Sequence, residues 1–274
     1  MSGARIGRRG LHLIALLAVV VFTLFPFYWM VSSSFKDQTD LLATPPMWLF
    51  EPTISHYAEI WEDQKLTSAI MHSLIVATCT TVLALGLGTP AAYALARFEF
   101  RGKGDLWFWF ITNRMISPIV LALPVYLLAR AVGILDTYLV LVLIYLTFNL
   151  PIVVWICTDQ FRSIPPDLEQ AARLEGANQF DVFWRVYLPL GLPGVAVSAI
   201  FSFIFSWNEL LYALVLTRSK VQTAPVVATS YMSGYEIPWG KIMATGTLIV
   251  LPVTIFALLV SRHMVRGLTM GATK

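Results

Sequence analysis

The sequence predicts an all-α protein that crosses a membrane six times. Hydrophobic residues make up 57% of the 274 residues and charged residues only 13%, whereas soluble domains carry about 25% charged residues. The mean hydropathy is +0.71. A bilayer core of about 30 Å needs about 20 apolar residues in a helix. A transmembrane β-barrel would instead show alternating segments of about ten residues, which are shorter and less uniform than the apolar stretches here.

Six apolar stretches, separated by charged or turn-rich connectors, are the predicted spans. They lie at about residues 11–31, 70–96, 106–129, 138–158, 191–217 and 242–260. The first stretch ends in the aromatic run 25–29, which is typical of an anchor at the membrane surface. A cleavable signal peptide is the alternative, because Arg5, Arg8 and Arg9 precede the stretch. The apolar run is, however, longer than the core of most signal peptides.

Lys and Arg residues predict the orientation. If the N-terminus is cytoplasmic, the cytoplasmic segments contain twelve Lys and Arg residues and the opposite segments six. Cytoplasmic connectors of membrane proteins carry an excess of these residues, so we expect a multi-pass protein of the cell membrane with both termini in the cytoplasm. The net charge of +3 therefore reflects topology. It does not indicate nucleic acid as a partner, because no basic patch accompanies it.

No motif in the sequence indicates catalysis or metal binding. The cysteines and histidines are scattered, and we expect packing or surface roles for Cys79, Cys157, His12, His56, His72 and His263. The Gly-x-x-x-x-Gly-Lys-Ser/Thr motif that holds nucleotide phosphates does not occur. The chain is therefore expected not to be an enzyme and to need no cofactor of its own.

The connector at about 159–189 is too polar to cross a membrane and predicts a cytoplasmic helix-turn-helix. The first helix is expected to begin near Pro165 and Pro166, because proline is favoured at the first helical position. It is expected to end at Gly176, because glycine adopts the left-handed conformation cheaply. The three- and four-residue spacing predicts one shared face for Leu168, Ala171, Ala172 and Glu175.

Aromatic residues predict the second helix of this connector. They recur at i, i+3, i+4 and i+7 and are Phe180, Phe183, Trp184 and Tyr187. The dipeptide Leu188-Pro189 is expected to stop this helix. Two amphipathic helices lying on the membrane and a docking element for a cytoplasmic partner are both compatible with this pattern.

The same connector resembles the EAA loop of binding-protein-dependent ABC importer permeases. Residues 168–177 have the sequence LEQAARLEGA, and Leu188-Pro189 follows at the spacing of that family. Gln170 replaces the usual first Glu, and Glu175 stands where Asp is common. The resemblance implies that coupling to an ATPase involves Glu169, Gln170, Ala171, Ala172, Glu175, Gly176, Leu188 and Pro189.

Other stretches resemble the maltose-type carbohydrate permeases of that family. They are residues 33–36, 91–98, 118–137, 205–209 and 265–272. The last of these is similar to the tail of the shorter, six-span partner of the two permeases. Because the resemblance covers nearly the whole chain, it implies type I ABC importer permease architecture, with residues 1–274 as a single transmembrane domain.

The resemblance also implies an assembly that imports a sugar or sugar alcohol. The expected partners are a second permease in a heterodimer, two copies of a cytoplasmic ABC ATPase, an extracytoplasmic solute-binding protein and membrane lipid. ATP and Mg²⁺ would be bound by the ATPase.

Polar residues inside the spans are candidates for the substrate pathway, because ionisable groups at membrane depth usually face a cavity or a partner. Amides and aromatic rings suit an uncharged sugar. The candidates are Asn113, Arg114, Asn149, Trp207, Asn208, Glu209 and Tyr212. The alternative is a structural role in which Arg114 and Glu209 pair, bind backbone groups or extend to the membrane surface.

Two rival functions remain open from the sequence. One is a permease of the same architecture for a polyol, a glycerol phosphate or an amino acid; a phosphate would favour more cationic residues than Arg114 alone. The other is a membrane enzyme or a non-ABC channel, for which the spans offer no dense polar cluster.

Overall fold

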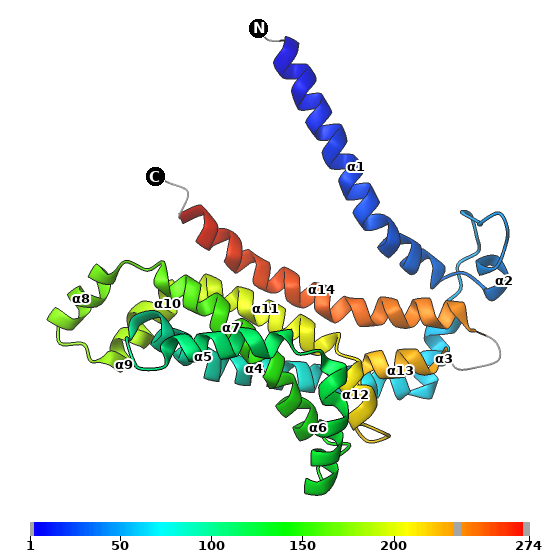
Figure 1. Cartoon of the computed structure of the whole chain (residues 1–274). Coiled ribbons are helices and arrows are strands. Elements are labelled where there is room, and N and C mark those ends of the chain that lie inside the picture. The colour runs from blue at the N-terminus through cyan, green and yellow to red at the C-terminus, as the bar shows by residue number, and fades with distance from the viewer. Residues whose placement is uncertain (1–2, 233–236, 271–274) are drawn as a thin grey trace. The chain divides into compact units, whose positions relative to one another are not determined.

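The computed structural model describes the backbone of residues 3–232 and 237–270 and the side chains of residues 12–232 and 237–259. Every regular element in these ranges is a helix, so the predicted all-α class is confirmed (Figure 1). The chain forms two compact units. Unit 1 comprises Met1–Thr67 and Ala228–Val250, and unit 2 comprises Ser68–Val227 and Leu251–Lys274. The single domain expected over 1–274 stays a prediction.

Unit 1 contains three helices of its own and parts of three shared ones. Its own helices are α1 (Gly3–Ser33), α2 (Gln38–Leu41) and α3 (Ser55–Asp63). The shared helices are α4 (Lys65–Arg97), α13 (Ala224–Ser230) and α14 (Trp239–Met270). The described side chains of α1 from Leu13 to Phe27 are exposed and mostly apolar. A helix that is hydrophobic on all sides suits a membrane span.

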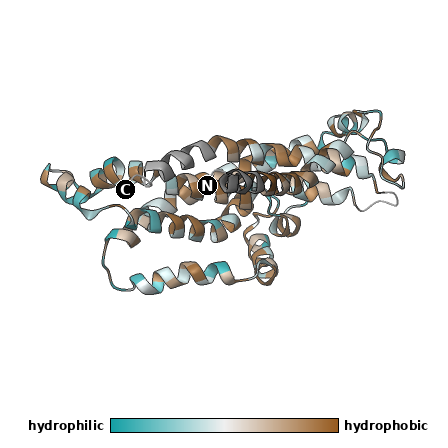
Figure 2. Ribbon diagram, turned by 90° about the horizontal axis from the view of Figure 1, so that it is seen from above, coloured by the Kyte–Doolittle hydropathy of each residue, from teal (hydrophilic) through white to brown (hydrophobic). Residues whose placement is uncertain are grey.

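Unit 2 holds the remaining helices. They are α5 (Lys103–Met115), α6 (Pro118–Val132), α7 (Tyr138–Arg162), α8 (Pro166–Leu174), α9 (Gln179–Val182), a π-helical segment (Phe183–Tyr187), α10 (Leu188–Leu190), α11 (Leu192–Trp207) and α12 (Leu211–Leu216). Helix α7 is the centre of the unit, with α5 and α11 packed along it. Its residues Tyr145, Val153 and Phe161 are fully buried. Apolar residues predominate along the long helices (Figure 2).

In the described part of the chain, four helices are long and apolar enough to cross a membrane: His12–Ser33, Lys65–Arg97, Tyr138–Arg162 and Trp239–Leu259. The number rises to six if each of two bent helix pairs is one span. The predicted continuous span 106–129 is therefore wrong in detail, because α5 and α6 meet at 96°. Ile116 and Ser117 adopt extended backbone conformations. A proline disfavours the helical conformation in the residue before it, and Ser117 precedes Pro118.

The predicted span 191–217 is also interrupted. Helix α11 ends at Trp207, and α12 begins only at Leu211. A second bend, of 73°, separates the segment Gln179–Leu190 from α11. It lies at Gly191, where a Cβ atom would come within 2.8 Å of the Tyr187 carbonyl oxygen, so only glycine fits this elbow.

Asp136 fixes the connector between α6 and α7 to the one that follows α12. Its carboxylate accepts hydrogen bonds from the backbone N–H groups of Arg218, Ser219, Lys220 and Val221 at 3.0–3.2 Å. Partial burial raises the pKa of this carboxyl, but the backbone donors outweigh it and hold the pKa below its usual value. The stabilisation is therefore present above the ordinary Asp pKa of about 3.9 and is lost as the pH falls through the lower, folded-state pKa.

Candidate functional site

The predicted helix-turn-helix exists and lies at one end of unit 2, after α7 (Figure 1). Helix α8 begins at Pro166, as the prolines predict, and ends in a turn centred on Gly176, whose φ is +89°. The N–H of Ala177 donates to the Ala172 carbonyl at 3.0 Å, and the N–H of Gly176 donates to the Arg173 carbonyl at 3.0 Å. This is the Schellman arrangement, in which a left-handed residue satisfies the last carbonyls of a helix.

Glu169 connects α8 to two other parts of unit 2. One carboxylate oxygen accepts from Arg97 Nε, near the end of α4, and from the Tyr187 hydroxyl, both at 3.0 Å. The other oxygen accepts from Arg173 Nη2 at 2.8 Å. The side chains of Glu169 and Arg97 are only 13% and 16% exposed. We call these four residues the Glu169 network.

The network keeps the Glu169 carboxylate ionised. Partial burial raises its pKa, but hydrogen bonds from Tyr187, Arg173 and Arg97 together outweigh burial and lower the pKa. An ionised carboxylate with charged donors makes stronger hydrogen bonds than a neutral group. Helix α8 is thus bonded to α4 and to the second helix of the pair instead of being attached by the chain alone.

The four aromatic residues of the second helix differ in exposure, which the spacing alone did not predict. Phe183 and Tyr187 are buried, and their ring centroids lie 5.2 and 4.9 Å from that of Tyr93 on α4. Phe180 and Trp184 are 70% and 50% exposed. The π-helical segment Phe183–Tyr187 explains part of the difference, because its wider turn departs from the 3.6-residue period on which the prediction rests.

Leu188-Pro189 does not stop the second helix, contrary to the prediction. The chain continues in helical conformation through Leu190 and bends only at Gly191. Pro189 follows the π-helical segment almost directly, and it has no N–H to donate to the preceding turn. Leu188 is half-buried and Pro189 exposed.

The predicted face of α8 is divided as well. Ala172 is half-buried against the cluster that includes Val182 and Phe183, whereas Ala171 is exposed. The exposed residues of this helix pair include Leu168, Gln170, Ala171, Leu174, Glu175, Phe180 and Trp184. Leu174 is 90% exposed, and the sequence pattern had not indicated it as a contact residue. Its three-residue spacing from Ala171 was the available signal.

Asn113 and Arg114 of α5 lie close to α7. Asn113 Nδ2 donates to the Thr147 carbonyl at 3.4 Å, and Arg114 Nη1 donates to the Phe148 carbonyl at 3.3 Å. The Arg114 guanidinium also lies 4.6 Å from the ring centre of Phe205 on α11. A cation over an aromatic face is attracted by the ring quadrupole.

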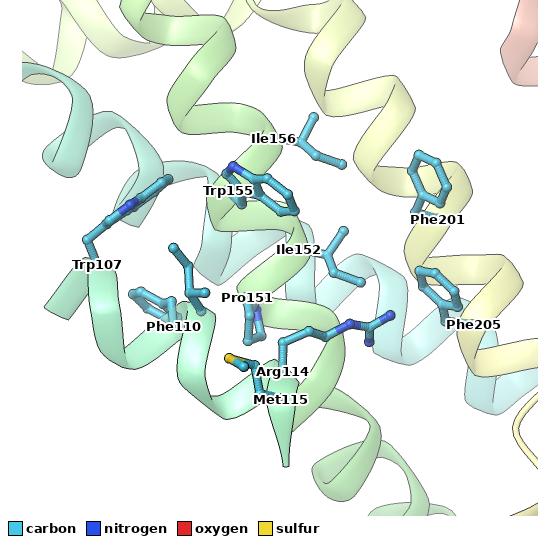
Figure 3. Close-up of a pocket in the computed structure, with 11 residues that line it drawn as sticks. Trp107, Phe110, Arg114, Met115, Pro151, Ile152, Trp155, Ile156, Phe201 and Phe205 are labelled. Atoms are coloured by element: carbon cyan, nitrogen blue, oxygen red, sulfur yellow. The ribbon is translucent and has the colours of Figure 1, made fainter. Parts of the chain in front are cut away.

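Arg114 lines an apolar cavity of about 370 Å³ between α5, α7 and α11. Figure 3 shows Trp107 and Phe110 of α5 facing Ile152 and Trp155 of α7, with Phe201 and Phe205 of α11 on the far side. Among the described residues, Arg114 is the only charged one that lines it. The cavity can therefore stack rings and offer one cationic donor.

Three other pathway candidates lie in the interior of unit 2. Asn149 is fully buried, and its Nδ2 donates to the Tyr145 carbonyl and to Ser206 Oγ, both at 2.9 Å. Trp207 and Tyr212 are 1% and 2% exposed. In unit 2 these residues join α7 to α11 and α12, and none of them lines the apolar cavity.

Glu209 lies two residues before helix α12 and caps its start. Its carboxylate oxygens accept from the backbone N–H groups of Tyr212 at 2.9 Å and Ala213 at 3.2 Å. Arg114 and Glu209 thus bind backbone groups, and no salt bridge joins them in the described part of the chain. Asn208 is exposed at the end of α11. Of Asn208 and Glu209, only Asn208 is free to meet a substrate.

Substitutions separate these roles. We expect Asn208→Ala to change uptake kinetics more than the amount of protein in the membrane. Glu209→Ala removes a helix cap, which costs about 0.5–2 kcal/mol, so it is expected to lower both protein amount and thermal stability. Uptake normalised to membrane protein, together with thermal unfolding, distinguishes the two. Unchanged uptake kinetics in both variants would leave neither residue in the pathway.

Residues 84–270 match the family described as the binding-protein-dependent transport system inner membrane component. The trehalose transport system permease protein SugB of Mycobacterium tuberculosis is 39% identical, over 93% of this chain and 94% of that protein. The probable ABC transporter permease protein y4oR of Sinorhizobium fredii is 37% identical, over 92% and 90%. The diacetylchitobiose uptake system permease protein DasC of Streptomyces coelicolor is 32% identical, over 94% and 95%.

Solved structures show the same fold. A chain of a bacterial ABC transporter involved in the import of alginate superposes with a TM-score of 0.78 at 21% identity, over 96% of this chain and 98% of that one. A chain of the MetNI methionine ABC transporter gives a TM-score of 0.62 at 18% identity, over 77% and 98%. The expected type I importer permease architecture is thereby confirmed. This chain belongs to the family of binding-protein-dependent transport system inner membrane components, the permease subunits of ABC transporters.

Proposed function

We propose that the chain is one permease of an ATP-driven importer for a sugar or sugar alcohol. A second permease would complete the pathway, two copies of a cytoplasmic ATPase would bind ATP and Mg²⁺, and an extracytoplasmic binding protein would deliver the solute. Similarity to trehalose and diacetylchitobiose permeases over more than 90% of the chain carries the sugar assignment. The names of those relatives favour a sugar over a glycerol phosphate or an amino acid.

The geometry of unit 2 supports coupling through α8. An ATPase that binds the exposed side of α8 and the exposed ring of Phe180 would move the whole helix pair. This pair is already bonded to α4 by the Glu169 network. The same pair continues through the Gly191 elbow into α11. A push on α8 therefore reaches two helices of unit 2. Nucleotide drives such a movement only if it binds the two conformations with different affinity.

The cavity beside Arg114 is the best candidate for the pathway in this subunit. Its indole and phenyl rings suit the apolar faces of sugar rings, and Arg114 supplies a hydrogen-bond donor. Residues of the partner permease would complete the substrate pathway.

Uptake by the reconstituted complex tests the assignment. The complex of this chain with its partner permease and ATPase is placed in liposomes with the cognate binding protein and a panel of radiolabelled solutes. We expect ATP-dependent uptake of a sugar or polyol that requires the binding protein. Uptake confined to a glycerol phosphate or an amino acid would contradict the substrate class.

Labelling of single cysteines tests the proposed topology. After replacement of Cys79 and Cys157, we expect cysteines at Gly176 and Arg101 to react with an impermeant maleimide only from the cytoplasmic side. A cysteine at Lys65 should react from outside intact cells. A fourth position from the same expectation, Gly234, lies outside the described residues. Reaction at position 176 from outside would overturn the orientation.

A further inference from the structure

A second cavity lies in unit 1, where α1 ends. Its volume is about 210 Å³. Polar side chains of Ser33, Lys36 and Asp40 line it, together with the indole rings of Trp29 and Trp239. None of these residues belongs to the pathway or to the coupling element described above.

Lys36 brings a buried ammonium group to this cavity. Lys36 is only 3% exposed, and its Nζ donates to the Met47 carbonyl at 2.7 Å. The rings of Trp29 and Phe50 lie 4.5 and 5.0 Å from Nζ. An ammonium has three N–H donors, and the Met47 carbonyl takes one of them. No carboxylate lies within salt-bridge distance of Nζ in the described residues.

Ser33 brings a hydroxyl that has no partner. Its neighbours Ser32 and Ser34 donate to the carbonyl oxygens of Trp29 and Val31, at 3.1 and 2.6 Å. Ser33 is 1% exposed, and its Oγ makes no hydrogen bond in the described part of the protein. Leaving a buried polar group unpaired costs about 1–3 kcal/mol. A ligand in the cavity would satisfy this hydroxyl.

The walls of the cavity are held in place by the chain that follows α1. The Thr53 N–H donates to the Phe35 carbonyl at 2.8 Å, and His56 Nε2 lies 3.0 Å from the Lys36 carbonyl oxygen. Trp48 packs edge-on against Trp29 at 5.4 Å between ring centroids. A preformed site loses less entropy when a ligand binds.

The combination of groups identifies the chemistry of the ligand. Lys36 donates hydrogen bonds, Asp40 accepts them, and the Ser33 hydroxyl does both. Sugar hydroxyls also donate and accept, and the apolar face of a sugar ring matches an indole. A neutral hydroxyl ligand can accept from the Lys36 ammonium and donate to the Asp40 carboxylate, whereas an apolar ligand would leave the polar groups unpaired. The volume is below the roughly 300–1,000 Å³ of sites for drug-sized ligands, which limits the ligand to about one ring.

We propose that this cavity, formed by Ser33, Lys36, Asp40, Trp29 and Trp239, binds one ring of a neutral sugar, separately from the pathway in unit 2. The inference rests on the proposed sugar import, since it names a second place where the same class of solute binds. The predicted topology places the cavity on the extracytoplasmic side, where sugar arrives.

Binding of sugar to the purified complex in lipid nanodiscs, without the binding protein, tests this site. Trehalose and glucose are the probes, and saturation-transfer difference NMR is the readout. Ala43 also lines the cavity, so Ala43→Phe is expected to fill it and abolish the signal. Ser33→Ala should weaken binding about fivefold, the effect of one neutral hydrogen bond. Ala58→Phe, at an exposed position of α3, is the matched control and should bind like the unaltered complex.

Three results would overturn the inference: no sugar signal from the unaltered complex, equal signals from Ala43→Phe and Ala58→Phe, or displacement of the sugar by inorganic phosphate. Uptake is measured on the same preparations with the binding protein present. Sugar uptake without cavity-dependent binding removes this inference and leaves the proposed function intact. Cavity-dependent binding without sugar uptake removes the proposed function instead.

Discussion

Replacing Gly176 with valine is expected to abolish most of the sugar uptake and the stimulation of the ATPase by the loaded binding protein. Gly176 has a φ of +89°, where an L-residue costs about 1–2 kcal/mol and a β-branched one is a severe outlier. A Cβ atom at this position would meet no atom within 4 Å. The effect therefore acts through the backbone: the Schellman turn opens, and α8 loses its fixed angle to the following helix.

Two companion variants separate the turn from the contact surface. Asparagine adopts the left-handed conformation more readily than most other non-glycine residues, so Gly176→Asn should keep most of the activity. Ala171→Arg adds bulk and charge at an exposed position of α8 and should weaken binding of the ATPase while the turn stays intact. Ala172→Arg is the poorer probe, because Ala172 is half-buried against the cluster that includes Val182 and Phe183 and the change would disturb the helix pair itself.

ATPase activity of the purified complex in lipid, with a pull-down of the ATPase, checks these expectations. All variants should insert into the membrane, because no spanning helix is altered. Full binding and full stimulation in both Gly176→Val and Ala171→Arg would make the helix pair a connector lying on the membrane. The coupling role of α8 would then be lost.

Local rules account for what the sequence predicted correctly. The start of α8 at Pro166 and its end at Gly176 depend on conformational preferences of single residues, which act over one turn of helix. The apolar stretches depend on composition over about 20 residues. Composition over such a window does not register a bend, so the 96° break before Pro118 was missed, although a proline in the stretch was a visible signal.

Tertiary contacts account for what the sequence did not predict. Arg97 and Glu169 are 72 residues apart and meet only because the fold brings the end of α4 to α8. The different exposure of Phe183 and Phe180 depends on the packing of Tyr93 and on a π-helical segment. The pathway candidates were chosen for polarity at membrane depth. Asn149 and Glu209 are polar for structural reasons instead, because Asn149 joins two helices and Glu209 caps a third.

Glu169→Ala is expected to uncouple the complex without removing any residue of the exposed face of α8. The change leaves Arg97 and the Tyr187 hydroxyl without their shared partner, and an unsatisfied group of this kind costs about 1–3 kcal/mol. Arg173 is more exposed, at 46% of its side chain, and its contact is an i,i+4 pair on one helix, worth about 0.3–0.5 kcal/mol. Arg173→Ala should therefore have a much smaller effect.

The measurement is a double-mutant cycle of Glu169→Ala and Arg97→Ala, with thermal unfolding and stimulated ATPase activity as readouts. We expect the double variant to be less affected than the sum of the single variants, because the two side chains act together. Glu99→Ala, which removes an exposed carboxylate outside the helix pair, is the matched control and should retain coupling. The lowered pKa of Glu169 adds a second signature: the network stabilises the protein above the ordinary Glu pKa of about 4.3 and loses this effect as the pH falls through the folded-state pKa. Glu169→Gln should remove that pH dependence. Additive effects in the cycle, with ATPase stimulation unchanged in Glu169→Ala, would show that the Glu169 network does not carry movement from α8 to α4.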